Sequence, residues 1–246
     1  MLLLNRLRSL LIPVPGDTDP EKAYDLWAGA YDAQPDNLML ALDDQLFSSM
    51  LEQVIINNKL VIDIGCGTGR HWPKLLSKHP ERLAGYDVSA GMLEVLQQKF
   101  PEQKLGKLTG EALPEPGESY DLLISTLTIA HIANASKALA EWERVLKPGG
   151  SILLTDYHPD ALAKGGDRTF KHQGKLVSVK NHVYSIAFIV ALARQLDLEV
   201  LRIAEKHIDE TVRHFYEKQD ALHVYEKFKG VPIIYGIHLK KKDAAA

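Results

Sequence analysis

The sequence contains a single cysteine, Cys66, among its 246 residues. One thiol cannot form a disulfide within the chain, which excludes the small disulfide-stapled folds of secreted proteins. This cysteine usage is typical of a reducing compartment, so we expect a cytoplasmic protein. Stability must then come from a hydrophobic core, for which an apolar content of 46% is sufficient.

The chain also lacks an excess of charge of either sign. Its 29 Lys and Arg residues against 32 Asp and Glu residues give a net charge of −3. A nucleic-acid-binding protein normally carries a basic face, so we expect no nucleic-acid partner. The ten histidines show neither an HxxxH pattern nor a carboxylate cluster at ligand spacing, and no metal site is predicted.

Long hydrophobic runs are missing as well. The first residues, MLLLNRLRSLLIP, are rich in leucine, but Arg6 and Arg8 interrupt them. No apolar stretch reaches the length of a signal peptide or a membrane span. The leucines of residues 1–12 follow helical spacing, which predicts a short amphipathic helix packed on its own domain. Weak peripheral contact of this helix with a membrane surface is the alternative.

Short apolar runs alternate with helical patterns through the middle of the sequence. This alternation indicates βαβ units and a parallel sheet with helices on both faces. We predict an α/β fold: one Rossmann-like, doubly wound, mostly parallel sheet of seven strands. The first five strands are expected at 60–64, 82–88, 104–108, 120–125 and 151–157, with KPGG (147–150) as a turn before the fifth.

Flanking segments are expected to supply a lid. Residues 1–58 predict an N-terminal helical segment that belongs to the same domain as the Rossmann-like region, 59–246. Insertions are expected near 158–182 and 206–230, the second with a long helix over Glu210–Lys229. With the N-terminal helices they can cover a ligand pocket. Two late strands, at 198–205 and 232–239, complete the sheet.

The stretch VIDIGCGTGRHW (61–72) contains the most informative motif. Its three glycines allow a tight turn and a close approach of backbone to a ligand. A dinucleotide loop would need a glycine where Arg70 stands, which disfavours a nicotinamide oxidoreductase. Asp63 beside the loop suits an ammonium group better than a pyrophosphate. Asp87 ends the second strand, where a carboxylate can accept both ribose hydroxyls; its alternative role is a helix cap, for which Ser89 is better placed.

These motifs resemble those of the class I S-adenosylmethionine-dependent methyltransferases, in the group that includes quinone and small-molecule methyltransferases. The resemblance covers roughly residues 20–157 and implies S-adenosylmethionine as the cofactor. It is specific for cofactor and fold and says little about the substrate. The segments that carry it are YDLWAGAYD (24–32), VIDIGCGTG, GYDVSAGML, EALP, SYDLLIS and LKPGGSILLTDY.

The resemblance implies a set of cofactor contacts. The methionine part would lie against Asp63 and the glycine loop, the ribose against Asp87, and the adenine between Val88 and Met92. Two tyrosines of the N-terminal segment would close over the cofactor, unless they are ordinary core aromatics. Cys66 would be a small filler within the loop. The set is Tyr24, Tyr31, Asp63, Gly65, Cys66, Gly67, Gly69, Asp87, Val88, Met92 and Ser125, the last expected just past the fourth strand.

One motif departs from the family. Where the family often has Gly-Asp-Ala-Glu, with the Asp bonded to the adenine amino group, this chain reads Leu108-Thr109-Gly110-Glu111. The Thr109 hydroxyl or the backbone near Gly110 would replace that contact, with Glu111 nearer solvent.

Methyl transfer from a sulfonium is an in-line displacement, for which a protein mainly supplies alignment and a dry pocket. If the acceptor must lose a proton, His131 and His158 are the candidate bases, although either can be an ordinary packed histidine. Arg168 and His182 are lid candidates. We predict methylation of a small, fairly apolar acceptor at O, N or C. The alternatives are a non-catalytic S-adenosylmethionine-binding module and a protein or RNA substrate.

Overall fold

The computed structural model describes residues 17–166 and 168–243. The helix expected in residues 1–12 lies outside the described residues. Within the described part of the chain, no helix is long and apolar enough to cross a membrane.

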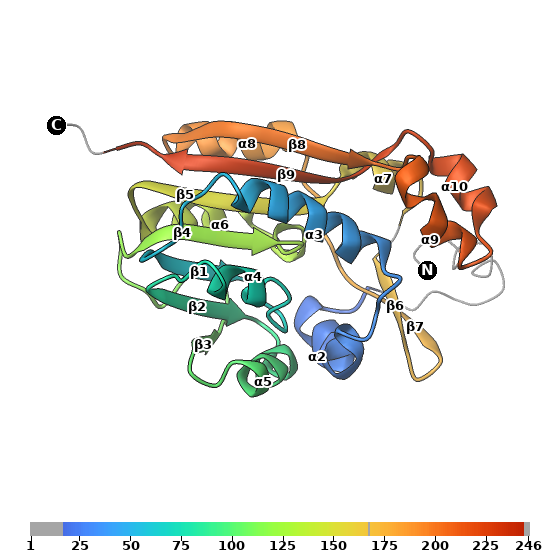
Figure 1. The fold of residues 1–246 in the computed structure, drawn as a ribbon, viewed down its shortest axis with the longest axis horizontal. Helices are drawn as coiled ribbons and strands as arrows, with labels where there is room; N and C mark the ends of the chain where they lie inside the picture. The colour runs from blue at the N-terminus through green and yellow to red at the C-terminus, as the bar shows by residue number, and fades with distance from the viewer. Residues whose placement is uncertain (1–16, 167, 244–246) are drawn as a thin grey trace.

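A seven-stranded sheet forms the centre of the molecule (Figure 1). From one edge to the other its strands are β3 (Lys104–Lys107), β2 (Arg82–Asp87), β1 (Leu60–Ile64), β4 (Tyr120–Thr126), β5 (Leu146–Tyr157), β9 (Pro232–Lys241) and β8 (Leu198–His207). The first five pair in parallel, and β9 runs antiparallel to both of its neighbours. The predicted α/β fold with a mostly parallel sheet of seven strands is confirmed.

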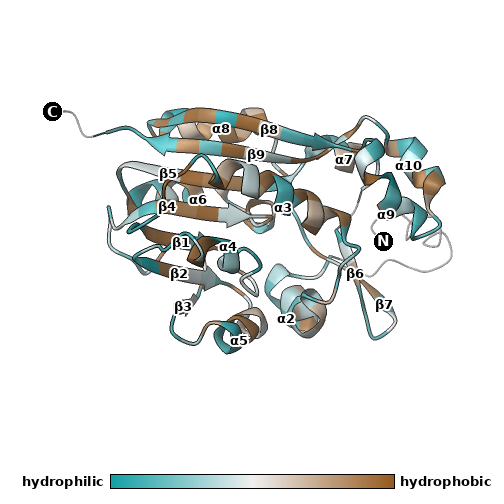
Figure 2. Ribbon diagram, in the orientation of Figure 1, coloured by the Kyte–Doolittle hydropathy of each residue, from teal (hydrophilic) through white to brown (hydrophobic). Residues whose placement is uncertain are grey.

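Helices cover both faces of the sheet because the central strands carry runs of successive apolar residues, whose side chains point alternately to opposite sides. Ile62 packs in the core under α6 (Ala135–Val145) and α8 (Ile186–Gln195). Its neighbour Val61 packs on the opposite face, in the core with residues of α3 (Leu38–Leu51), α4 (Trp72–Leu76) and α5 (Ala90–Lys99). Figure 2 shows the apolar residues of these central strands in brown.

The N-terminal helix α2 (Pro20–Tyr31) and the hairpin β6–β7 (Thr169–His172 and Lys175–Ser178) lie near the carboxyl ends of the parallel strands (Figure 1). Asp19 caps α2 by accepting from the Glu21 backbone N–H, and Pro20 begins the helix. Helix α2 packs against α5 and β6. Helix α2 therefore covers the carboxyl ends of the parallel strands, where ligands bind in open α/β folds.

The long helix predicted over Glu210–Lys229 is wrong. The structure has three short pieces there, η2 (Glu210–Val212), α9 (Arg213–Glu217) and α10 (Leu222–Phe228). The break lies at Asp220, which has a φ of 51°, and the Ala221 N–H bonds back to the Tyr216 carbonyl at 2.9 Å. A left-handed residue with a backward bond of this kind ends a helix.

The turn predicted at KPGG is also wrong, because β5 already begins at Leu146. The pairing of β4 with β5 shifts register between Tyr120 and Leu122, and this irregularity accommodates the proline and glycines within the strand.

Candidate functional site

A cavity of about 310 Å³ lies at the carboxyl ends of β1, β2 and β4, and we call it the loop cavity. Its wall combines the glycine loop, the ends of β2 and β4, residues 108–113 after β3, and one side of α2. The volume falls in the range of small-molecule sites, about 300–1,000 Å³.

Two glycines of the loop are required for different reasons. Gly65 has a φ of 71°, and a Cβ there would lie 2.1 Å from Thr128 Oγ1, so only glycine fits. Gly67 has a φ of 52°, but a Cβ there would meet no atom of the described residues within 4 Å. Since Gly67 lines the loop cavity, its missing side chain leaves room for a ligand beside the backbone.

Asp87 connects the glycine loop to the end of β2. Its Oδ2 accepts from the Gly67 backbone N–H at 2.8 Å, and its Oδ1 accepts from the Ser89 N–H at 2.9 Å. Burial raises the pKa of Asp87 in spite of these donors. Ser89, not Asp87, caps α5, through the Met92 N–H. Asp87 therefore fixes the loop and contributes to the cavity wall at the same time.

Asp63 precedes Ile64 in β1; Ile64 lines the loop cavity, and Asp63 is not among the lining residues. Its Oδ2 accepts from the Trp72 indole N–H at 2.8 Å, whereas its Oδ1 is buried with no partner among the described residues. Burial raises the pKa of Asp63 to about 7; the Trp72 bond opposes the rise and the charge of Asp87 adds to it. A buried carboxylate oxygen without a donor is a group that a cationic ligand would stabilise.

His131 ends the short η1 turn (Ile129–His131) and lines the loop cavity. Its Nδ1–H donates to the Lys180 carbonyl at 3.0 Å, because a carbonyl only accepts. Its Nε2 accepts from the Tyr24 hydroxyl at 2.9 Å and from the Arg168 guanidinium at 2.6 Å. Burial and the charge of Arg168 lower the pKa of His131 to about 3, so the imidazole is neutral. The unprotonated Nε2 of His131 therefore already accepts hydrogen bonds, and the imidazole ring orients the Tyr24 hydroxyl.

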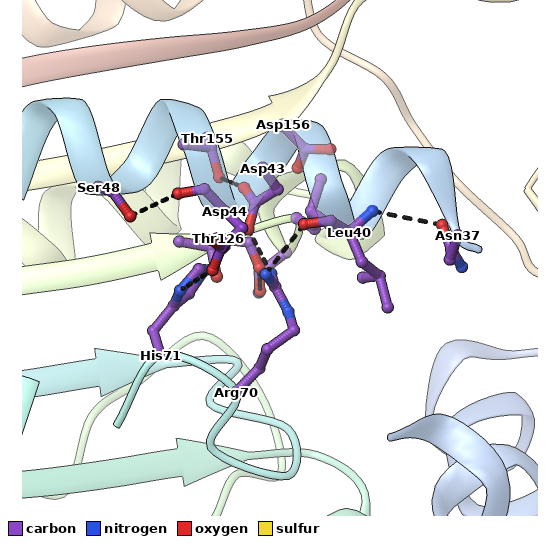
Figure 3. A network of polar contacts seen from close by, with 12 residues as sticks. Asn37, Leu40, Asp43, Asp44, Ser48, Arg70, His71, Thr126, Thr155 and Asp156 are labelled. Atoms are coloured by element: carbon purple, nitrogen blue, oxygen red, sulfur yellow. Dashed lines mark hydrogen bonds and ion pairs between the residues drawn. The ribbon is translucent and has the colours of Figure 1, made fainter. Parts of the chain in front are cut away.

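A buried polar network ties α3 to the end of the glycine loop (Figure 3). Asp43 accepts from the Arg70 guanidinium, from the Thr155 hydroxyl and from His71 Nε2, the last at 2.8 Å. Arg70 also donates to the Leu40 carbonyl at 3.3 Å. Burial alone would raise the pKa of Asp43, but the His71 bond and the Arg70 charge hold it well below its usual range. The network fixes the N-terminal segment to the chain that directly follows Gly69.

Residues 62–154 match the family model described as a methyltransferase domain. This range begins in β1 and ends in β5, so it contains the glycine loop, Asp87 and the strands that carry the loop cavity. Residues 62–154 are therefore a methyltransferase domain, as the resemblance of the motifs to the class I S-adenosylmethionine-dependent enzymes implies. The matched range leaves out α2, α3 and the last two strands of the sheet.

Two relatives share the methyltransferase domain. The chain is 39% identical over 112 residues to malonyl-[acyl-carrier protein] O-methyltransferase of Yersinia pestis, covering 44% of this chain and 40% of that protein. It is 32% identical over 103 residues to the ubiquinone/menaquinone biosynthesis C-methyltransferase of Campylobacter jejuni, covering 39% and 44% respectively. The chain thus spans less than half the length of either relative.

A solved structure has the same fold. The S-adenosylmethionine-dependent methyltransferase from Mesorhizobium loti superposes with a TM-score of 0.63 at 15% identity, covering 79% of this chain and 95% of that one. At this identity the likeness concerns the fold alone. The domain match and the fold together imply S-adenosylmethionine as the cofactor.

Most residues expected to contact the cofactor lie together in the wall of the loop cavity, and His131 lies there with them. These residues come from α2, the loop, β2–α5 and the segment after β3: Tyr24, Tyr31, Gly65, Gly67, Asp87, Val88, Met92, Thr109, Gly110 and Glu111.

Four residues expected to contact the cofactor are not among the wall residues: Asp63, described above, and Cys66, Gly69 and Ser125. The Cys66 sulfur packs against Gly85, 2.9 Å from where a Cβ would stand, in the core around Trp72. A Cβ on Gly69 would lie 2.3 Å from Leu96 Cδ1, so this third glycine allows close packing on α5. Ser125 lies inside β4 rather than past its end, and its buried hydroxyl has no partner among the described residues. The Ser125 side chain is buried because its position in β4, and not its place near the end of the apolar run, sets its direction.

His158 also lies away from the loop cavity. It caps α7 (Pro159–Ala163), with Nδ1 accepting from the Asp160 N–H at 3.1 Å, and its Nε2–H donates to Glu205 at 2.9 Å. The expectation that it contacts substrate is not supported by this position, and the capping role explains the residue. His182 contributes a backbone N–H to the Ala130 carbonyl, at 2.6 Å.

Several residues of the cavity wall were not predicted from the sequence. The last residue of β4, Thr126, and the two residues that follow it, Leu127 and Thr128, line the cavity. Their proximity to the glycine loop could have been inferred, because β1 and β4 are neighbours in a doubly wound sheet. Trp142 of α6 also lines the cavity, and no local pattern indicates that.

Proposed function

We propose that this protein transfers the methyl group of S-adenosylmethionine to a small-molecule acceptor at O, N or C. The observation that carries the proposal is the composition of the loop cavity. Its wall brings together open backbone at Gly67 and the carboxylate of Asp87, and strand β1, which leads into the loop, carries Asp63, whose Oδ1 has no partner among the described residues. The Gly67 backbone suits the methionine part of the cofactor, Asp87 suits the ribose, and Asp63 suits the ammonium group.

In this proposal Asp63 accepts from the ammonium group, and the Gly65–Gly67 backbone holds the methionine part. Asp87 accepts from the ribose, and Thr109 contacts the adenine. When bound, the cofactor supplies a methyl group activated by its sulfonium. The chain contributes alignment and exclusion of water through α2, whose Tyr24 and Tyr31 close the cavity.

We propose that His131 is a positioning residue and not a general base. Its Nε2 already accepts two hydrogen bonds, and its low pKa makes it a weak base. An acceptor that needs no strong base, such as an amine, an activated carbon or an acidic hydroxyl, fits this site best. The single buried cysteine supports a reducing, cytoplasmic location, and the near-neutral charge supports the absence of a nucleic-acid partner.

The proposal is tested by incubating the protein and S-adenosylmethionine with phenols, amines, carboxylic acids and quinols, and measuring release of S-adenosylhomocysteine. We expect release with at least one class and none with the Asp87→Ala variant. Cofactor binding without release in any class would favour a non-catalytic binding module. Release only with protein or RNA added would contradict the small-molecule acceptor.

A further inference from the structure

A second cavity, of about 620 Å³, lies beside the first, and we call it the outer cavity. Its volume also falls in the range of small-molecule sites, about 300–1,000 Å³. Its wall is built by segments outside the matched domain range, including both insertions. Among the wall residues are Trp27 and Ala30 of α2, Met39 of α3, Phe170 of β6 and Tyr216 of α9.

The two cavities share helix α2 in their walls. Helix α2 contributes Tyr24 and Tyr31 to the loop cavity, and Trp27 and Ala30 to the outer cavity. Leu127 lines the loop cavity and packs against the hydrophobic cluster that surrounds the outer one. A molecule in the outer cavity is therefore adjacent to the place proposed for the methyl donor.

Aromatic rings dominate the wall of the outer cavity. The rings of Trp27 and Phe170 stack in parallel, with centroids 4.4 Å apart and an interplanar angle of 1°. Tyr157, Phe215 and Tyr216 add further rings. Such surfaces favour a flat aromatic ligand over a flexible chain, because rings stack with little loss of conformational freedom.

Two hydroxyl groups of this wall have no hydrogen-bond partner. Thr169 Oγ1 and Tyr216 Oη are both buried and unpaired among the described residues. Buried polar groups in folded proteins are nearly always paired, with protein, water or ligand. Burial raises the pKa of Tyr216, so its hydroxyl stays a neutral donor.

Charge at the outer cavity argues against a cationic ligand. Among the described residues of the wall, Asp36 carries the one carboxylate, and it forms an ion pair with Lys218 at 2.7 Å. Lys171 of β6 adds a positive charge to the wall. A cation would therefore find no uncompensated negative charge there.

We propose that the outer cavity binds the methyl acceptor, and that this acceptor is an aromatic molecule whose oxygen substituents accept hydrogen bonds from Thr169 and Tyr216. The assignment rests on the proposed methyltransferase function for the role of the ligand, but the binding site itself can be tested without the cofactor.

The test uses calorimetry with 1-naphthol as an aromatic probe that carries oxygen, naphthalene as the probe without oxygen, and dodecanoate as a flexible chain. Ala30 is an exposed helix residue in the wall, so Ala30→Trp obstructs the cavity at little cost to folding. We expect this variant to weaken 1-naphthol binding about tenfold or more. Leu26→Trp is the matched control, since Leu26 is 46% exposed on the same helix and lines neither cavity. This variant should bind 1-naphthol as tightly as the unchanged protein does.

Removal of the hydroxyl groups tests the polar part of the assignment. Thr169→Val and Tyr216→Phe should each weaken 1-naphthol binding about three- to tenfold and leave naphthalene binding unchanged. Absent 1-naphthol binding, equal binding by Ala30→Trp, or tighter binding of dodecanoate would each overturn the assignment. S-adenosylhomocysteine is titrated in parallel: its failure to bind contradicts the proposed function, whereas its binding without 1-naphthol binding contradicts only the outer-cavity assignment.

Discussion

Replacement of Gly67 by alanine separates the folding role of the glycine loop from its binding role. At a φ of 52° an alanine should lower the free energy of unfolding by about 1 kcal/mol. No clash adds to this cost, because the new Cβ would meet no atom of the described residues within 4 Å. The alanine methyl group instead projects into the loop cavity, where the methionine part of the cofactor is proposed to lie. We expect the affinity for S-adenosylhomocysteine to fall about tenfold, or about 1.4 kcal/mol.

Gly230→Ala is the matched control for this variant. Gly230 has a φ of 81°, its Cβ would also meet no described atom within 4 Å, and it lines neither cavity. Urea denaturation should show a similar loss of stability for both variants, whereas calorimetry should show weaker binding for Gly67→Ala alone. Equal affinities in the two variants would refute the reasoning that places the cofactor against Gly67.

Three further predictions concern buried carboxylates. Asp87→Asn should weaken S-adenosylhomocysteine binding by about 1–3 kcal/mol in calorimetry, because one acceptor oxygen is lost; an unchanged affinity would place the ribose elsewhere. Asp43→Asn should lower the free energy of unfolding by about 3–5 kcal/mol in urea, because Arg70 loses its charged partner. The folded-state pKa of Asp43 lies below the ordinary value of 3.8, so the stability lost in Asp43→Asn should be largest above pH 3.8 and should decrease as the pH falls further. A stability loss that stays constant with pH would contradict this reasoning. Asp63 has the opposite shift, from 3.8 to about 7, so its ionisation destabilises the folded protein without ligand as the pH rises through that interval. A bound ammonium group favours the ionised form, so affinity for S-adenosylhomocysteine should rise from about pH 5.5 to about pH 7.5, and Asp63→Asn should remove that rise.

Local sequence patterns predicted much of the fold and of the cofactor side of the site. The run LVIDI (60–64) coincides with β1, because a short β-branched run that ends at glycines has few other conformations available. The positions of Gly65, Gly67 and Asp87 in one cavity wall could be predicted because each depends on neighbours within one βα unit. The class I methyltransferase resemblance rested on the same local motifs.

Contacts between distant segments could not be predicted in this way. Thr155 donates to Asp43, 112 residues away, and Arg168 reaches His131 across 37 residues. No local periodicity encodes such pairs. The same limit explains His158, whose place after a strand suggested a substrate contact, although its actual partner Glu205 lies on a strand far along the chain. The outer cavity is likewise built by segments that only the tertiary fold brings together.

The most direct test of the central claim is a calorimetric titration of the protein with S-adenosylhomocysteine, with NADH in a parallel titration. Binding at one site per chain, displaced by S-adenosylmethionine and absent with NADH, is the predicted result. Binding of NADH with no heat from either S-adenosyl compound would contradict the claim that the loop cavity holds the methyl donor.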